Sequence, residues 1–205
     1  VMARRGPDLG RRGFLVGIGA SAAALVALTA GQSFDALAPL NLFAPRTKGA
    51  GPQALPVNRT ARQAGVTDDA ARNGWTLDVS GPAGTLRLSR ADLDRMPQAA
   101  ARLPIACVEG WSTSADWEGV RLRDLLDRVG VPADRTIRLE SMQTHGPYRA
   151  TTMPAEYARD PLTLVALRLN GETLDLDHGY PARIIAPGRP GVLQTKWLTR
   201  IRVEA

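Results

Sequence analysis

The residue best suited to carry chemistry is Cys107, the single cysteine of this 205-residue chain. It lies in the stretch PIACVEGWS, and no intrachain disulfide can form without a second cysteine. An isolated cysteine is a small core residue, a nucleophile or a metal ligand. A nucleophile needs a histidine base, and only His145 and His178 are present, with no acidic group evident to orient either. Structural zinc needs several Cys or His ligands, so a single thiolate better suits a metal that a cofactor also ligates.

Hydrogen-bond donors are concentrated near the C-terminus, around a glycine-containing loop. The stretch LDHGYPARIIAPGRPGVLQTKW contains His178, Arg183, Gln194, Thr195 and Lys196. Arginine can hold a phosphate through two parallel hydrogen bonds, lysine adds a compact positive charge, and glycines let backbone N–H groups approach. These residues predict a site for an anionic, amide-rich ligand. The alternative from the residues alone is a polar loop between two edge strands.

The alternation of apolar and polar residues predicts the elements that position these groups. Residues 75–80 and 85–88 should form a β-hairpin, and Ser89 should cap a short helix that runs to Met96. VRLRDLLDRVG, residues 120–130, has one apolar helical face and predicts a helix that ends at Gly130.

Further strand-like runs follow the helix predicted at 120–130. They cover residues 136–142, 148–153, 162–169, 182–186 and 197–203, and 103–108 form a short apolar stretch around the cysteine. A short helix is expected after Pro154, and Asn170-Gly171 is a strong hairpin signal. Strands outnumber helices and lack the spacing of regular βαβ units, so we predict an α+β, mainly β, mixed-sheet fold preceded by one N-terminal apolar helix.

The N-terminal region has a composition unlike the rest of the chain. A basic segment (1–12) precedes the small-apolar run 13–31, and residues 32–74 have the composition of a tether and extended arm ahead of a domain at 75–205. The string Arg11-Arg12-Gly13-Phe14-Leu15 resembles a twin-arginine export signal, and the alternative is a membrane anchor. Pro39 follows the best cleavage site, Ala36-Leu37-Ala38, which favours a retained anchor. Both interpretations predict a periplasmic or other extracytoplasmic catalytic domain held at the cell membrane.

The charge distribution argues against nucleic acid as a partner. The formal net charge is +6, but four positive residues lie in the first twelve positions, and aromatic residues make up only 5% of the chain. No basic run is interleaved with aromatic rings that could stack on bases. We therefore predict no nucleic-acid binding.

Four motifs together resemble a known family. CVEGWS, WEGVRLRDLL, DPLTLVALRLNGETL and DHGYPARIIAPG…KW occur in the family's order over about residues 77–203. In these features the chain is similar to the molybdopterin-binding domain of the sulfite-oxidase-like oxidoreductases. It most resembles the exported bacterial branch that includes the methionine-sulfoxide-reducing molybdoenzyme.

The resemblance implies a cofactor and a set of site residues. The thiolate of Cys107 would bind molybdenum beside the two dithiolene sulfurs of one molybdopterin. The cofactor-binding residues would be Asn58, Ser141, His178, Arg183, Gln194, Thr195 and Lys196. Trp111 and either Tyr148 or Arg149 would line the substrate pocket.

Two departures from the family leave the substrate open. Sulfite oxidases follow the cysteine with arginines that attract sulfite, whereas this chain has Val108-Glu109-Gly110-Trp111. The methionine-sulfoxide branch has an aromatic pair shortly after the arm asparagine, whereas Arg59-Thr60-Ala61-Arg62 follows Asn58 here. The dimerisation domain of sulfite oxidases does not occur after the domain, so we expect a monomeric catalytic unit.

The implied function is a molybdenum-dependent oxidoreductase that transfers an oxygen atom to or from a small sulfur or nitrogen compound. Electrons would be exchanged with a membrane haem or quinone-linked subunit, because the sequence has no haem-ligand motif of its own. One alternative is a non-enzymatic exported binding module that retains the fold. Another is a cysteine hydrolase that uses His145 or His178.

Overall fold

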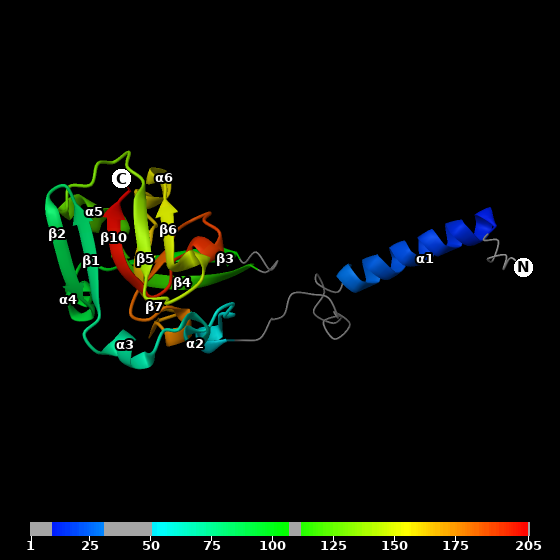
Figure 1. Cartoon of the computed structure of the whole chain (residues 1–205), viewed down its shortest axis with the longest axis horizontal. Coiled ribbons are helices and arrows are strands. Elements are labelled where there is room, and N and C mark those ends of the chain that lie inside the picture. The colour runs from blue at the N-terminus through cyan, green and yellow to red at the C-terminus, as the bar shows by residue number, and fades with distance from the viewer. Residues whose placement is uncertain (1–9, 31–50, 107–111, 205) are drawn as a thin grey trace, which may run out of the picture. The chain divides into compact units, whose positions relative to one another are not determined.

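The computed structural model describes residues 10–30, 51–106 and 112–204. The chain divides into two compact units, Val1–Arg46 and Thr47–Ala205. Figure 1 shows the elements of each unit.

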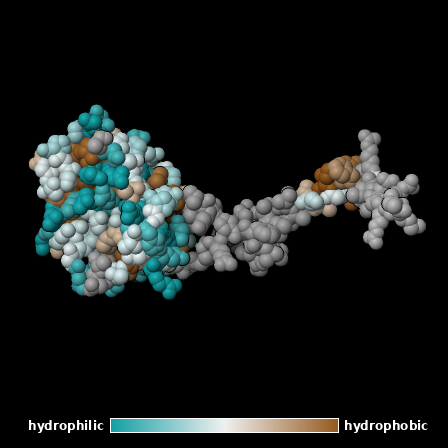
Figure 2. Space-filling model, in the orientation of Figure 1, coloured by the Kyte–Doolittle hydropathy of each residue, from teal (hydrophilic) through white to brown (hydrophobic). Residues whose placement is uncertain are grey.

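The first unit contains the helix α1 (Arg11–Ala30), which confirms the predicted N-terminal helix. Phe14, Leu15, Val16 and Ile18 are exposed on it and give it the hydrophobic patch seen in Figure 2. In the described part of the chain, no helix combines the length and the apolar character needed to cross a membrane. The predicted transmembrane helix at 13–31 is thus not supported.

One five-stranded sheet of the second unit pairs its first strand with its last. Its order is β2-β1-β10-β5-β6, with β1 parallel to β10 and the other pairs antiparallel. The strands are β1 (Thr76–Gly81), β2 (Gly84–Ser89), β5 (Ile137–Ser141), β6 (Ala150–Met153) and β10 (Leu198–Val203). In β1, buried Leu77 and Val79 alternate with partly exposed Asp78 and Ser80, as the sequence predicted. The predicted hairpin of β1 and β2 is confirmed.

The second sheet has the order β3-β4-β7-β8, and β9 also pairs with β7. Its strands are β3 (Ala99–Ala106), β4 (Ser112–Arg121), β7 (Leu164–Leu169), β8 (Glu172–Thr173) and β9 (Arg183–Ile185). The predicted Asn170-Gly171 turn joins β7 to β8, with φ angles of 50° and 83°. Strand β4 was not predicted.

The helices of this unit are short. They are α2 (Ala61–Ala64), α3 (Asp68–Arg72), α4 (Arg90–Arg95), α5 (Leu122–Arg128) and α6 (Ala155–Ala158). Ser89 caps α4, because its side chain accepts a hydrogen bond from the backbone N–H of Asp92. The helix predicted at 120–130 begins only at Leu122, because Val120 lies in β4 and pairs with Val165.

Both sheets contribute to one apolar core. Leu77 and Ile201 from the first sheet and Val165 and Ile184 from the second are fully buried in the same cluster. The three leucines of α5 belong to the same cluster. This core holds the C-terminal stretch in place and so fixes the backbone on which its polar side chains are mounted.

The segment predicted as an extended arm packs against the domain. Leu55 is buried in a second cluster with Ile105 and Trp117. The sequence analysis missed the two short helices α2 and α3 in this segment; Thr60 caps α2 with Gln63 as its capping-box partner. The compact unit that begins at Thr47 therefore includes these arm residues.

Candidate cofactor-binding site

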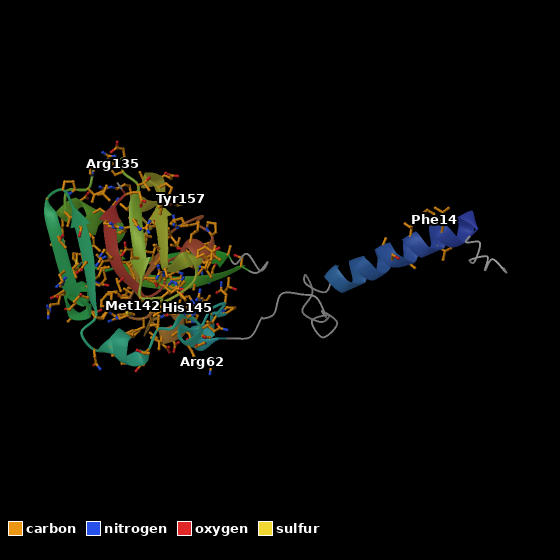
Figure 3. The ribbon with its side chains drawn as sticks, viewed as in Figure 1. Phe14, Arg62, Arg135, Met142, His145 and Tyr157 are labelled. Carbon is orange, nitrogen blue, oxygen red and sulfur yellow. The ribbon has the colours of Figure 1, made fainter. Side chains whose placement is uncertain are left out.

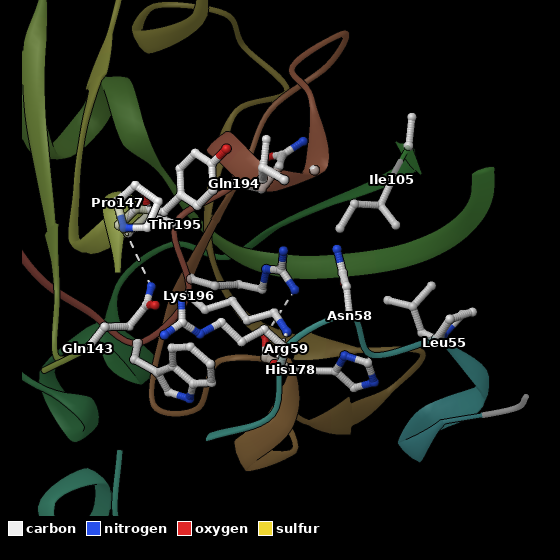
Figure 4. A pocket seen from close by; sticks show the side chains of 17 residues that line it. Leu55, Asn58, Arg59, Ile105, Gln143, Pro147, His178, Gln194, Thr195 and Lys196 are labelled. Atoms are coloured by element: carbon white, nitrogen blue, oxygen red, sulfur yellow. Dashed lines mark hydrogen bonds between the residues drawn. The ribbon is translucent and has the colours of Figure 1, made fainter. Parts of the chain in front are cut away.

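A cavity of about 250 Å³ lies where three distant segments meet. The arm, the loop after β5 and the C-terminal stretch all contribute to its wall (Figure 4). The lining residues include Leu55, Asn58, Arg59, Gln143, Pro147, Tyr148, His178, Arg183, Gln194, Thr195 and Lys196. Seven of the residues predicted from the sequence are thus brought together here: Asn58, Tyr148, His178, Arg183, Gln194, Thr195 and Lys196.

Arg183 is the most deeply buried cation of the cavity, with 1% of its surface exposed. Strand β9 places it, and its Nη1 donates a hydrogen bond of 3.0 Å to the carbonyl oxygen of His178. Its Nε has no hydrogen-bond partner among the described residues. Burial lowers the pKa of the guanidinium to about 9. The protein therefore holds a charged group here without fully satisfying its donors, which is unfavourable unless a ligand completes the site.

Lys196 adds a second cation. Its Nζ donates to the carbonyl oxygens of Asp177, at 2.7 Å, and Arg59, at 3.1 Å. Burial, and then the positive charge of Arg183, lower its pKa to about 7. An anion beside this ammonium would favour its charged form and raise that pKa again.

The cavity cations lack a carboxylate partner in the part of the chain that the structure describes. Among the described residues, no ion pair includes Arg59, Arg183 or Lys196. Buried cations without counter-charges are costly, and a phosphate could accept hydrogen bonds from both arginine and lysine. The donor set therefore fits the phosphate end of a pterin cofactor.

His178 contributes a neutral ring to the same cavity. Its Nε2 donates a hydrogen bond of 2.7 Å to the carbonyl oxygen of Pro52 in the arm. Burial lowers its pKa to about 4, so the ring is neutral near pH 7. The other ring nitrogen, Nδ1, is then an acceptor for an N–H or O–H group.

Gln194 and Thr195 line the cavity but are also bound within the protein. The Gln194 side chain accepts from the backbone N–H of Ala186 and donates to the carbonyl oxygens of Ala186 and Arg189. It thereby closes the loop between β9 and β10. The Thr195 hydroxyl lies 3.0 Å from that of Thr151.

Two predicted residues do not line the cavity. The Ser141 hydroxyl donates to the carbonyl oxygen of Lys196 at 2.7 Å and accepts from the backbone N–H of Gln143 at 3.2 Å. Ser141 therefore does not face the cavity but holds the backbone of two residues that line it, Gln143 and Lys196. Arg149 is exposed at the end of the 3-10 turn Pro147–Arg149, next to Tyr148, which does line the cavity.

Cys107 and Trp111 lie outside the described residues. The two residues that immediately precede the cysteine in sequence, Ile105 and Ala106, line the cavity at the end of β3. The strand therefore brings the chain to the cavity wall one residue before the proposed metal ligand.

The sequence analysis missed Arg59 and Gln143 as site residues. Gln143 is 8% exposed, and its Oε1 has no hydrogen-bond partner among the described residues. The available signal was its place as a polar residue just after the buried strand β5. Arg59 was noted only as a departure from the family pattern.

The fold and the site together define a domain whose cavity presents cationic and amide side chains that could hold an anionic cofactor. The oxidoreductase molybdopterin binding domain family matches residues 63–205, and the chain belongs to this family. Its class is therefore that of the molybdenum-dependent oxidoreductases, and its cofactor is molybdenum-molybdopterin.

Several characterised proteins are similar to this chain. Sulfite oxidase of Arabidopsis thaliana is 35% identical over 114 residues, which cover 47% of this chain and 29% of that protein. The catalytic subunit of the protein-methionine-sulfoxide reductase of Gluconobacter oxydans is 31% identical over 146 residues, or 63% of this chain and 46% of that one. The crystal structure of the sulfane dehydrogenase SoxCD from Paracoccus pantotrophus superposes with a TM-score of 0.57 at 26% identity, covering 63% of this chain and 38% of the other. The chain thus spans less than half of each of these proteins.

Proposed function

We propose that this protein is an extracytoplasmic oxidoreductase that transfers an oxygen atom to or from a small sulfur or nitrogen compound. The observation that carries the proposal is a pair of cations, fully buried Arg183 and partly buried Lys196, that have no carboxylate partner among the described residues. The chain's family binds molybdopterin, and the phosphate of that cofactor would be the anion that such a pair requires. The bound cofactor would supply two-electron redox chemistry at the metal.

The chain's own residues would bind and orient the cofactor. Arg183 and Lys196 would hold its phosphate, and neutral His178 would accept a hydrogen bond at Nδ1. Gln143 would offer its unpartnered Oε1 to an N–H group. Cys107 would provide the thiolate ligand to the metal.

The experiment is a measurement of molybdenum and pterin in protein purified from a host that makes the cofactor. We expect close to one molybdenum and one pterin per chain. Cys107→Ser should abolish turnover while the circular dichroism spectrum and the melting temperature stay unchanged. Full turnover by this variant would exclude the cysteine as a catalytic ligand, and protein without molybdenum or pterin would refute the whole proposal.

We further propose that the domain is exported and exchanges electrons with a membrane haem or quinone-linked subunit. Support comes from the Arg11-Arg12-Gly13-Phe14-Leu15 string and from the similarity to a catalytic subunit of a reductase. Replacing both arginines with lysine should trap the protein in the cytoplasm if export uses the twin-arginine route. Unchanged export of this variant would contradict that route. If the wild-type protein also stayed in the cytoplasm, the proposed location would be wrong.

A further inference from the structure

The arm segment 51–59, here called the strap, forms one side of the cofactor cavity. Leu55, Asn58 and Arg59 of the strap line the cavity (Figure 4). None of the strap residues belongs to a strand, and every strand pair in the described part of the chain lies within residues 76–203. The strap could therefore detach without breaking either sheet, as segments that open locally do.

One side chain, that of Gln53, fastens the start of the strap to the β7–β8 hairpin. Its Nε2 donates to the carbonyl oxygens of Leu169, at 3.2 Å, and Thr173, at 3.0 Å. Its Oε1 accepts a hydrogen bond of 2.9 Å from the backbone N–H of Asp175. Asn170, in the turn of the same hairpin, donates from its side chain to the Gln53 carbonyl oxygen at 2.8 Å. These four bonds all meet at a single residue of the strap.

The backbone of the strap is strained at this point. Gln53 and Ala54 both have φ of 58°, a left-handed conformation that is unfavourable for residues other than glycine. The Ala54 side chain is exposed, so its own packing does not compensate. Strained backbone of this kind persists only where the surrounding contacts impose it. The bonds of Gln53 and the burial of Leu55 therefore hold the strap closed against this strain.

Two side chains of the candidate cofactor site also bind the strap. His178 donates from Nε2 to the carbonyl oxygen of Pro52 at 2.7 Å, which leaves Nδ1 for a ligand. Lys196 donates to the carbonyl oxygens of Arg59 and Asp177, which leaves the third N–H of its ammonium for an anion. Both side chains can thus hold the strap and a ligand together. A ligand that contacts the strap and these side chains at once would favour the closed state.

The part of the arm that follows the strap is anchored separately. Helix α2 contributes buried alanines to a cluster with Trp197. Arg62 of α2 and His145, both labelled in Figure 3, mark this second anchor, where Nε2 of His145 bonds to the carbonyl oxygen of Gln63 at 2.9 Å. The strap could therefore open at Gln53 while α2 stays docked.

We propose that the strap is a lid over the cofactor cavity and that Gln53 is its latch. The cofactor enters and leaves when residues 51–59 are detached, and the closed strap retains it. The proposal rests on the proposed function only in placing the cofactor in this cavity. Gln53 does not line the cavity, so it acts on the cofactor through the strap alone.

Hydrogen exchange in cofactor-free protein tests the latch. The control for Gln53→Ala is Gln98→Ala, because Gln98 also donates from Nε2 to two backbone carbonyls but does not line the cavity. Amides of residues 53–59 should exchange at least about tenfold faster in Gln53→Ala than in wild type, and at the wild-type rate in Gln98→Ala. Exchange in β1 and β10 should not change in either variant.

Asn170→Asp tests the same latch from the hairpin. Aspartate can still accept from the backbone N–H of Asp116, as Asn170 does at 3.0 Å, but it cannot donate to the Gln53 carbonyl oxygen. Exchange of residues 53–59 should accelerate at least about threefold in this variant. Because the substitution leaves the strap sequence intact, agreement with Gln53→Ala would assign the effect to the latch.

Cofactor release is the second readout. The rate at which loaded protein releases pterin, followed by fluorescence, should rise at least about tenfold in Gln53→Ala and stay at the wild-type value in Gln98→Ala. Wild-type exchange of residues 53–59 in both Gln53→Ala and Asn170→Asp would show that Gln53 is not a latch. Faster exchange with an unchanged release rate would show that the strap is not the lid. Equal acceleration in the strap and in β1 would mean a general loss of stability and would also overturn the inference.

Failure of the proposed function would look different. Wild-type protein that contains neither molybdenum nor pterin would refute that function. The exchange measurement needs neither component, so it reports on the latch even in such protein.

Discussion

The guanidinium carbon of Arg183, which lines the cavity, lies 4.9 Å from the ring centre of Trp117. Both side chains have 1% of their surface exposed. The ring stabilises the cation in part, since cation–π contacts of desolvated groups contribute about 2 kcal/mol. It does not replace the missing partner of Nε, so the arginine is retained at a cost to the stability of the cofactor-free protein.

Arg183→Met should therefore separate stability from cofactor binding. Methionine removes the buried charge but also the donor to the carbonyl oxygen of His178. These two effects oppose each other, so the free energy of unfolding of the cofactor-free protein should stay within about 1 kcal/mol of wild type. Pterin content should fall to a small fraction, because the phosphate loses a buried donor. Urea unfolding and pterin fluorescence measure the two effects.

Arg189→Met is the matched control for loss of a buried arginine. Arg189 donates to the carbonyl oxygens of Leu193 and Thr152, at 2.9 and 2.6 Å, and leaves both unsatisfied when it is removed. We expect a loss of about 1–3 kcal/mol in the unfolding free energy. A larger loss for Arg183→Met than for Arg189→Met would show that Arg183 serves the fold.

The lowered pKa of His178 predicts that the folded protein loses stability in acid. Its native pKa of about 4 lies below its ordinary value of 6.5, so the unfolded chain binds more protons between these values. Stability should therefore fall by up to about 3 kcal/mol as the pH drops from 6.5 to 4. His178→Gln, which keeps an N–H donor for Pro52, should lose less over this range in urea titrations. His145→Gln should keep the full decline, and a wild-type decline in His178→Gln would contradict the role of this ring.

The lowered pKa of Lys196 predicts that the protein takes up a proton when an anion binds in the cavity. The ammonium has a pKa of about 7 in the cavity, so it is mostly neutral at pH 8.5, and an anion raises that pKa. Calorimetry of inorganic phosphate binding to cofactor-free protein, in two buffers of different ionisation enthalpy, should give about one proton taken up at pH 8.5 and much less at pH 6. Lys196→Met should take up much less than the wild type, and identical heats in both buffers would disprove the linkage in the wild type.

The parts of the fold that the sequence predicted are those with a strong local pattern. The β1–β2 hairpin, the Ser89 cap and the Asn170-Gly171 turn each have a local physical signal in a few adjacent residues. Strand β4 was missed because its first five residues, STSAD, are small or polar and alternate weakly. Helix α2 was missed although Thr60 and Gln63 form a capping-box pattern, because four residues are too few for a helical period.

The residues of the candidate site likewise divide into those that a local sequence pattern predicted and those that only the tertiary structure brings to the cavity. His178, Arg183, Thr195 and Lys196 come from one stretch, so their joint presence was visible in the sequence. Arg59 joins them only because the arm packs on the domain. The neutral state of His178 depends on the burial of its ring in the folded domain, which no local pattern encodes.

The contact between the arm and the loop after β5 (residues 142–149) can be tested at Gly65. This glycine has φ of 71°, and a Cβ on it would lie 2.1 Å from the Thr144 hydroxyl. Gly74 has φ of 73° but no atom within 4 Å of such a Cβ, so Gly74→Ala measures the backbone strain alone. Gly65→Ala should destabilise by about 1–3 kcal/mol more than Gly74→Ala, because Thr144 must move away from the arm. Hydrogen exchange at residues 143–149 should also accelerate in Gly65→Ala only. Equal melting temperatures and equal exchange in the two variants would show that the arm does not hold the loop.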